Sequence, residues 1–185
     1  NSYRITIHSK IIADFFKSQF GKYSYKKSLP HWILPLPSSK QIELIKGLWR
    51  GDSCLRDKDF CYVTSSRSLV YQLRDILLRL GVIPSLQIRK KEHLNRVVNK
   101  IEGRSVGFNH DKYHLTVGGQ FLFRISDILG IVHPVLKTRT MICKHAWLTK
   151  DFAILPIREI EKIPYEGEVL NLAVPESAGR QYRAT

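Results

Sequence analysis

One carboxylate in this sequence follows two glycines that are spaced one helical turn apart. Asp52 comes directly after Gly51, and Gly47 lies four residues before Gly51. Glycine costs about 1 kcal/mol relative to alanine inside a helix, so a pair on one face indicates that another backbone comes very close. A carboxylate at a helix C-terminus also meets the negative end of the macrodipole, which is unfavourable unless a cation lies there. The pattern predicts two closely packed helices that present Asp52 to a metal ion.

The element that must position Asp52 is a predicted helix that begins near Ser38 and Ser39, whose hydroxyl groups can cap its first amides. Apolar residues recur along it at intervals of three and four, which is the pattern of a helix with one buried face. They are Leu44, Ile45, Leu48 and Trp49.

Residues 45–53 read Ile-Lys-Gly-Leu-Trp-Arg-Gly-Asp-Ser, and this segment resembles the LAGLIDADG motif of homing endonucleases in the form found inside inteins. The resemblance implies that Asp52 is the metal-binding acid and that Gly47 and Gly51 lie at the contact between two motif helices. Ser53 departs from the motif, because the family usually ends it with glycine. The resemblance also implies a divalent ion, Mg²⁺ or Mn²⁺.

Two lysines lie in segments that resemble other parts of the same family. Lys27 opens the sequence Lys-Ser-Leu-Pro, similar to a Lys-x-Ile-Pro segment that precedes the second motif in intein endonucleases. Residues 113–137 resemble the closing segment of the second half, with Lys137 at its basic position. An amine at either place could stabilise negative charge that develops on a phosphate. The alternative is that both are surface lysines in basic segments.

The charge balance favours a polyanionic partner. Thirty Lys and Arg face sixteen Asp and Glu, which gives a net charge of +14 and a pI near 9.9. Nucleic acid is the first candidate, and a solvated basic surface is the alternative. No apolar run approaches the roughly 18 residues of a membrane span, and residues 1–10 do not resemble a secretory signal. The three cysteines have no metal-ligand spacing, so we expect them to be reduced and the protein to be intracellular, in the cytoplasm.

The hydrophobic periodicity predicts an α+β fold. Alternating or polar-bounded apolar segments predict strands, and apolar residues at helical spacing predict helices. Strands are expected at 3–8, 54–56, 60–64, 85–91 and 112–117, with helices at 9–20, 38–52, 66–80 and 121–129 and a loop at 93–110. From the motif helix onward the order is αββαββα. The resemblance implies the same order, with helices on one face of a saddle-shaped antiparallel sheet.

Polar side chains alternate along the last two strands, opposite the apolar ones. A twisted antiparallel sheet can lie in the major groove, where its side chains reach base edges that differ between base pairs. Polar residues also face water on most half-buried sheets, which is the alternative. The residues expected to contact DNA are Gln87, Arg89, Lys91, Lys112, His114 and Thr116.

The chain is expected to have three parts. Residues 1–35 would be the tail of a preceding endonuclease half with a linker, and residues 36–140 the LAGLIDADG half. Residues 141–185 would form a small β segment, with strands at 152–157 and 167–174, that resembles the C-terminal part of an intein splicing domain. The sequence ends in no His-Asn pair and begins with no Cys or Ser, so self-splicing by this polypeptide is not expected.

The function expected from these features is site-specific cleavage of double-stranded DNA by metal-dependent hydrolysis of phosphodiester bonds. A second LAGLIDADG half would be needed, either from a missing N-terminal part of the same protein or from a second copy of this chain. Two alternatives stay open: a DNA-binding protein of the same fold that does not cleave, and a splicing-inactive intein fragment. No membrane is expected as a partner.

Overall fold

A four-stranded antiparallel sheet with the order β1-β2-β6-β3 carries the fold. The computed structural model describes residues 6, 8–56, 58–94, 99–101, 104–131, 147–149, 152–157 and 159–168. The strands are β1 (Ser53–Arg56), β2 (Asp59–Thr64), β3 (Ser85–Arg89) and β6 (Lys112–Gly118). Strand β6 lies between β2 and β3, and its side chains alternate, with Tyr113, Leu115 and Val117 buried. This alternation gives the sheet one core face and one open face.

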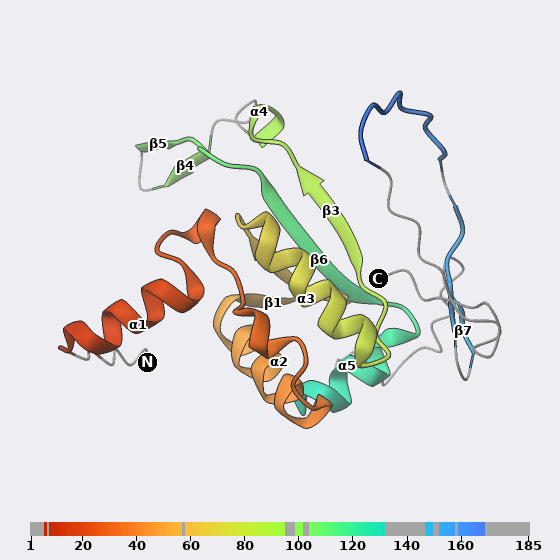
Figure 1. Ribbon diagram of the computed structural model, residues 1–185, viewed down its shortest axis with the longest axis horizontal. Coiled ribbons are helices and arrows are strands. Elements are labelled where there is room, and N and C mark those ends of the chain that lie inside the picture. Colours follow the sequence, from red (N-terminus) through yellow and green to blue (C-terminus); the bar gives the residue numbers. More distant parts are fainter. Residues whose placement is uncertain are drawn as a thin grey trace. The chain divides into compact units, whose positions relative to one another are not determined.

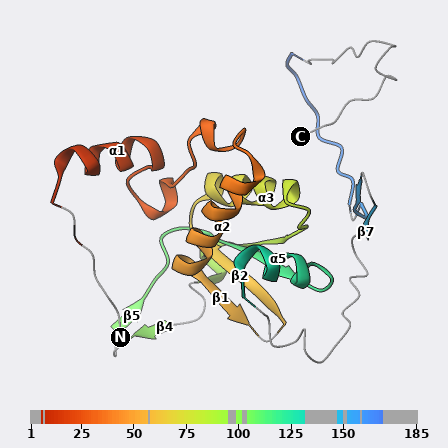
Figure 2. The ribbon, with the colours of Figure 1, turned by 90° about the horizontal axis from the view of Figure 1, so that it is seen from below.

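Three helices cover the core face of the sheet, as Figures 1 and 2 show: α2 (Ser38–Asp52), α3 (Arg67–Arg79) and α5 (Phe121–Leu129). Helix α2 turns Gln41, Ile45 and Trp49 inward, at successive positions on one face. The predicted order αββαββα is confirmed from α2 to α5. The largest fully buried side chains are those of Gln41, Ile45, Tyr62, Val70, Leu73, Ile76, Leu77, Leu115, Leu122, Ile125 and Leu129.

The hydroxyl cap expected for α2 is wrong. Pro37 occupies the cap position of α2 and Ser38 already lies in the helix, so no side chain caps the first amides. The carbonyl oxygen of Pro37 accepts from the amides of Lys40 and Gln41 at 2.9 Å and 3.2 Å, and the proline ring restricts the backbone where the helix begins. Helix α3 has a serine cap, because the hydroxyl of Ser66 accepts a hydrogen bond from the amide of Leu69 at 3.2 Å.

The segment between α1 (Lys10–Phe20) and α2, residues 21–37, is called the connector. It is not fully extended, although its prolines favour extended backbone. It contains two single 3₁₀ turns, η1 (Ser24–Lys26) and η2 (His31–Ile33). Leu29 and Ile33 are buried in the core, which explains why the chain bends toward the helices here.

An insertion takes the place of the loop expected at 93–110. It contains the short helix α4 (Lys91–Leu94) and the strands β4 (Asn99–Ile101) and β5 (Arg104–Val106), which pair with each other. Asp111 closes its base, because its carboxylate accepts a hydrogen bond from Lys90 Nζ at 3.1 Å and one from the Lys91 amide at 3.0 Å. These two donors lower the pKa of Asp111, the backbone amide of Lys91 having the larger effect.

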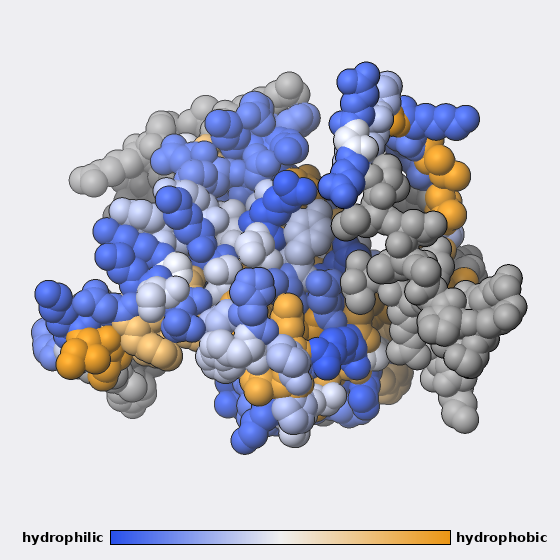
Figure 3. Space-filling model, in the orientation of Figure 1, coloured by the Kyte–Doolittle hydropathy of each residue, from blue (hydrophilic) through white to orange (hydrophobic). Residues whose placement is uncertain are grey.

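Helix α1 (Lys10–Phe20) forms as expected from its sequence, but its apolar face is exposed. Ser9 caps it by accepting from the Ile12 amide at 3.4 Å. Gly21 ends it at φ 82°, where an added Cβ would collide with the carbonyl oxygen of Lys26. Ile11 and Phe15 are 83% and 51% exposed, and Figure 3 shows apolar residues on the surface where Figure 1 has α1. Of the strand expected at 3–8, only residues 6 and 8 are described, and neither lies in a strand.

The C-terminal strands are shorter than expected. Strand β8 (Ala153–Ile154) pairs with β7 (Trp147–Leu148), so the strand expected at 152–157 is reduced to two residues. Residues 156–185 form a separate unit, whose described part, 156–157 and 159–168, contains no helix or strand. The strand expected at 167–174 lies mostly outside the described residues, and the domain boundaries at 35 and 140 stay predictions. Among the described helices, none combines the length and the hydrophobicity that crossing a bilayer requires.

Candidate active site and nucleic-acid interface

Lys27 and Asp52, which were nominated from separate motifs, lie next to each other in the structure. The Nζ atom of Lys27 is 3.8 Å from Oδ2 of Asp52. Asp52 is the last residue of α2, and Lys27 follows η1. The side chain of Asp52 is 60% exposed and that of Lys27 is 49% exposed, so solvent and a ligand can both reach the pair. An exposed ion pair of this kind stabilises a fold by at most about 1 kcal/mol, so the pair contributes little to stability.

Tyr62 lies close enough to Asp52 to feel its charge. Burial raises the pKa of the Tyr62 hydroxyl to about 12, and the negative charge of Asp52 adds to the shift. Tyr62 also packs against Trp49 of α2, with ring centroids 5.4 Å apart. The end of α2 that carries Asp52 is therefore held on β2 by aromatic packing.

The glycine face of α2 is open in this structure. A Cβ added at Gly47 or at Gly51 would meet no atom within 4 Å, so no described element makes the close backbone approach that the glycines suggest. Beside this face, Leu48 lines a pocket of about 390 Å³ together with Phe16 and Phe20 of α1. Helix α2 thus has a face without side chains at Gly47 and Gly51, which we call the glycine strip, and this face lies next to the apolar pocket.

The described residues contain no group of three or more His, Cys, Asp or Glu side chains that could hold a metal ion by themselves. Mg²⁺ in proteins keeps several waters and is bound through one or two carboxylates plus substrate phosphates. A single exposed carboxylate such as Asp52 fits that use as one ligand among several.

The open face of the sheet brings together five of the six residues expected to contact DNA. The register places Arg89 opposite Lys112, Gln87 opposite His114 and Ser85 opposite Thr116, so these side chains share one face. Lys91 is the exception: β3 ends at Arg89, and Lys91 begins α4, where it is exposed. The alternation expected through residue 91 stops because the chain leaves the sheet for the insertion. Lys137 lies outside the described residues.

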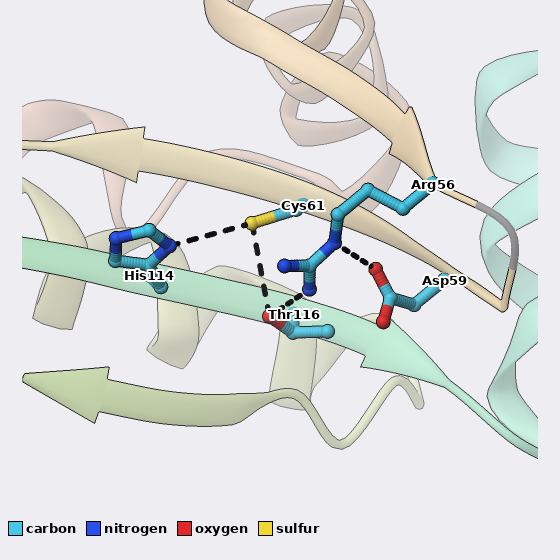
Figure 4. Close-up of polar contacts among 5 residues, drawn as sticks. All are labelled: Arg56, Asp59, Cys61, His114 and Thr116. Atoms are coloured by element: carbon cyan, nitrogen blue, oxygen red, sulfur yellow. Dashed lines mark hydrogen bonds and ion pairs between the residues drawn. The ribbon is translucent and has the colours of Figure 1, made fainter.

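Arg56 belongs to the same open face, although the sequence analysis did not select it. Figure 4 shows its side chain directed toward residues of β2 and β6. Its Nε donates to Asp59 Oδ1 at 2.6 Å, and its Nη2 donates to Thr116 Oγ1 at 3.2 Å. The predicted hairpin could have paired Arg56 with Asp59 from the sequence, but the position of both beside Thr116 follows from the register of β2 with β6.

The polar network of Figure 4 continues to His114. The Sγ atom of Cys61 lies 3.9 Å from His114 Nδ1, and the Thr116 hydroxyl lies 3.8 Å from the same sulfur. Burial raises the pKa of the Cys61 thiol, which keeps it neutral. Burial also lowers the pKa of His114, and the positive charges of Arg89, Arg56 and Lys112 lower it further. The open face is thus a surface that disfavours one more positive charge and favours an anion.

An exposed acid at the end of a glycine-containing helix and a basic open sheet face are both consistent with the resemblance in the motif. Residues 39–125 match the family model of the LAGLIDADG-like domain. The matched range runs from the first turn of α2 to the middle of α5, and it includes Asp52, Arg56 and the open face. Lys27 lies outside the matched range.

Three curated proteins are similar to most of this chain. An uncharacterized protein of Methanocaldococcus jannaschii is 31% identical over 176 residues, which are 92% of this chain and 20% of that protein. The ATP-dependent DNA helicase Hel308 of Thermococcus kodakarensis is 27% identical over 90% of this chain and 14% of its own length. The replicative DNA helicase DnaB of Synechocystis is 28% identical over 78% of this chain and 17% of its own length. The chain therefore spans a fifth or less of each of these proteins.

Among solved structures, variants of the homing endonuclease I-DmoI are similar to this chain. The similarity has a TM-score of 0.42 at 17% sequence identity, and it covers 66% of this chain and 54% of that one.

Proposed function

We propose that this chain is one half of a site-specific DNA endonuclease that cleaves double-stranded DNA with the help of a divalent ion. The observation that carries the proposal is the position of Lys27 beside Asp52, at the end of the motif helix of a LAGLIDADG-like domain. An acid that can hold a metal ion and an amine that can contact phosphate are then within reach of the same phosphodiester.

In this proposal the open face of the sheet binds the DNA. Lys and Arg contacts to phosphates would give most of the affinity, and side chains directed at base edges would give the specificity. Arg89, Lys112 and Arg56 provide positive charge on that face, and Gln87 can offer both a donor and an acceptor to one base. Asp52 directly precedes β1, which carries Arg56, so the acid lies at one end of a strand of this surface.

Asp52 would hold Mg²⁺ or Mn²⁺ as one carboxylate ligand. When bound, such an ion lowers the pKa of a water molecule and neutralises charge on the leaving oxygen. The ammonium of Lys27 would stabilise the additional negative charge that develops on the phosphate. Lys137 would have the same role from the closing segment of the domain.

The second half of the enzyme would pack against the glycine strip of α2. In the part of the chain that the structure describes, a Cβ added at Gly47 or Gly51 would meet no atom within 4 Å, and this supports the proposal because two glycines on one helical face have a cost that a close partner offsets. The exposed apolar residues of α1 would belong to the same preceding half. The partner would be a further part of the same protein or a second copy of this chain.

We also propose that the chain derives from an intein. The same stretch is similar to short portions of three much longer proteins, two of which have different helicase names, and this distribution supports an element inserted into unrelated hosts. Reading the coding sequence on both sides of the chain tests this origin. An inserted element predicts a second motif upstream and host sequence that resumes after the splice junction.

The test of the nuclease is incubation of the protein that carries this chain with a long mixed-sequence DNA library, with and without Mg²⁺, followed by sequencing of the ends. The proposal expects cuts at one recurring sequence only in the presence of the metal, and none with Asp52→Asn. DNA binding without cleavage would instead favour a non-cleaving DNA-binding protein of this fold. Little affinity for DNA would favour a splicing-inactive intein fragment, and DNA binding that falls steeply with salt would argue against that fragment.

A further inference from the structure

The backbone that follows Lys27 is tied to helix α3. The side-chain amide of Gln72 makes two hydrogen bonds to a single residue of the connector, because Leu29 N donates to Gln72 Oε1 at 2.7 Å and Gln72 Nε2 donates to Leu29 O at 2.8 Å. An amide side chain has both a donor and an acceptor, so it can bind a backbone residue as a neighbouring strand would. Leu29 is thereby fixed both by these bonds and by burial of its side chain.

A second contact acts on Lys27 itself. The hydroxyl of Ser66, which caps α3 by accepting from the Leu69 amide, also donates to the carbonyl oxygen of Lys27. The amide of Ser28 donates to the carbonyl of Phe20 at 3.1 Å. The backbone at positions 27, 28 and 29 is therefore held by hydrogen bonds at every residue.

A third contact lies two residues before Lys27. The ring of Tyr25 stacks on His110 with centroids 4.0 Å apart and planes inclined by 25°. His110 lies next to Asp111, which closes the base of the insertion. Before Lys27 the connector is thus held by the stacking of Tyr25 on His110, next to the base of the insertion. After Lys27 it is held by the hydrogen bonds of Leu29 to α3.

The side chain of Lys27 is not restrained in this way. It is about half exposed, and its ammonium group lies 3.8 Å from Asp52. Lysine is a compact charge on a flexible four-carbon stem, so the place its ammonium can occupy depends on where its backbone is held. A shift of about 1 Å in a catalytic group can cost about 100-fold in rate.

We propose that Gln72 is a positioning residue for Lys27: by binding both backbone groups of Leu29 it holds the connector so that the Lys27 ammonium stays beside Asp52 at the reacting phosphate. This inference rests on the proposed nuclease function and adds to it a residue of α3 that contacts neither DNA nor metal. Ser66 has a supporting part, which is harder to separate because its hydroxyl also caps α3.

The test replaces Gln72 with methionine, which has a similar length but cannot make either hydrogen bond. Gln41 gives a matched control, because it too binds connector carbonyls, donating to Leu34 O at 2.7 Å, but farther along the chain from Lys27. Gln72→Met and Gln41→Met are compared with the unchanged protein, each alone and in the Lys27→Ala background. The measurements are the single-turnover cleavage rate at saturating protein with Mg²⁺, the affinity for DNA, and the hydrogen exchange of the Leu29 amide.

We expect Gln72→Met to lower the cleavage rate by about 10-fold or more and to change DNA affinity by less than about 2-fold, since the bound DNA contacts are elsewhere. The Leu29 amide should lose its protection. In the Lys27→Ala background the same substitution should have no further effect, because there is no amine left to position. Gln41→Met should leave the cleavage rate unchanged in both backgrounds. Gln72→Glu keeps an acceptor for the Leu29 amide but turns a carboxylate oxygen toward the Leu29 carbonyl oxygen, so it should also lower the rate, and only while Lys27 is present.

The outcomes separate this inference from the function on which it rests. Suppose that the unchanged protein cleaves DNA and that Lys27→Ala slows it. If Gln72→Met then leaves the cleavage rate unchanged, or if its rate reduction multiplies that of Lys27→Ala in the double variant, only the positioning role is overturned. If Lys27→Ala has no effect while Asp52→Asn abolishes cleavage, Lys27 is not catalytic and the inference falls with it. If no DNA is cleaved at all, the proposed function itself fails. Should Gln72→Met be too unstable to assay, Gln72→Glu must still lower the cleavage rate while Lys27 is present and leave it unchanged in the Lys27→Ala background.

Discussion

The ammonium nitrogen of Lys27 lies 3.8 Å from a carboxylate oxygen of Asp52, although Lys27 belongs to the connector and Asp52 ends α2. The two residues face solvent, so their attraction is worth little to folding. We propose that the two residues lie close together because they act on a shared ligand, and the predictions below test that proposal and the surface beside it.

Asp52→Asn should abolish metal-dependent cleavage, and Lys27→Ala should reduce the rate by about 100-fold to 1,000-fold, the usual cost of removing one group that stabilises transition-state charge. The melting temperature should stay almost unchanged for both, because the ion pair is exposed. Lys26→Ala is the control, because Lys26 is the neighbouring residue in the chain but its Nζ atom lies over the ring of Tyr25, 5.8 Å from the ring centroid. Cleavage at the original rate by Lys27→Ala would remove Lys27 from the active site.

Gly47→Ala should have opposite effects on stability and on activity. The added Cβ meets no described atom within 4 Å, so the free energy of unfolding should rise by up to about 1 kcal/mol from helix propensity. The same Cβ should separate two closely packed motif helices, and association with the second half and cleavage should both weaken. Ser68→Ala on the exposed side of α3 serves as the comparison. A more stable protein that associates and cleaves as before would show that no helix packs on Gly47.

His114 should make DNA binding depend on pH. Its pKa lies below the ordinary value because of burial and three neighbouring cations, and a bound polyanion should raise it. Affinity for DNA should therefore increase as pH falls from about 7.5 to about 5.5, and this increase should be smaller in His114→Gln. His93→Gln, in α4, is the control. An identical pH profile in His114→Gln would mean that another group takes up the proton.

The same shift makes a prediction about stability. Because the folded pKa of His114 is depressed, the unfolded chain binds a proton more readily, and the free energy of unfolding should decrease as pH falls below about 6.5. Denaturant titrations of the unchanged protein and of His114→Gln across this range measure the contribution. The stability that depends on neutral His114 is fully present above the pKa that this residue has in the unfolded chain. It is lost as pH falls through the lower pKa that His114 has in the folded protein.

Arg56 should contribute to sequence discrimination. Asp59 and Thr116 orient its guanidinium group over the open face, and a planar fork can bind a guanine edge at two points. Arg56→Lys keeps the charge but not the fork, so specific binding should fall by about 10-fold while non-specific binding stays the same. Asp59→Asn should raise non-specific affinity, because an acidic group leaves the surface, and should lower the ratio of specific to non-specific binding. Equal losses on all DNA sequences after Arg56→Lys would assign Arg56 to a phosphate.

Local patterns in the sequence were enough to predict the three covering helices, the four strands of the main sheet and the core face of β6, but not the elements α4, β4 and β5 between β3 and β6. Hydrophobic periodicity is a local property, and the alternation at Tyr113, Leu115 and Val117 can be read without knowing what they pack against. Two separate segments also indicated Asp52 and Lys27: the segment at residues 45–53 contains Asp52, and the Lys-Ser-Leu-Pro segment begins with Lys27.

Which of these residues meet became visible only in the folded chain. The backbone around Lys27 is bonded to Gln72 of α3 and to Ser66 just before it, and the place of Arg56 beside Thr116 depends on two strand registers. The exit of Lys91 from the sheet depends on the insertion that Asp111 closes. Such relationships join segments far apart in the chain, and they follow from packing and register, which periodicity within one segment does not encode.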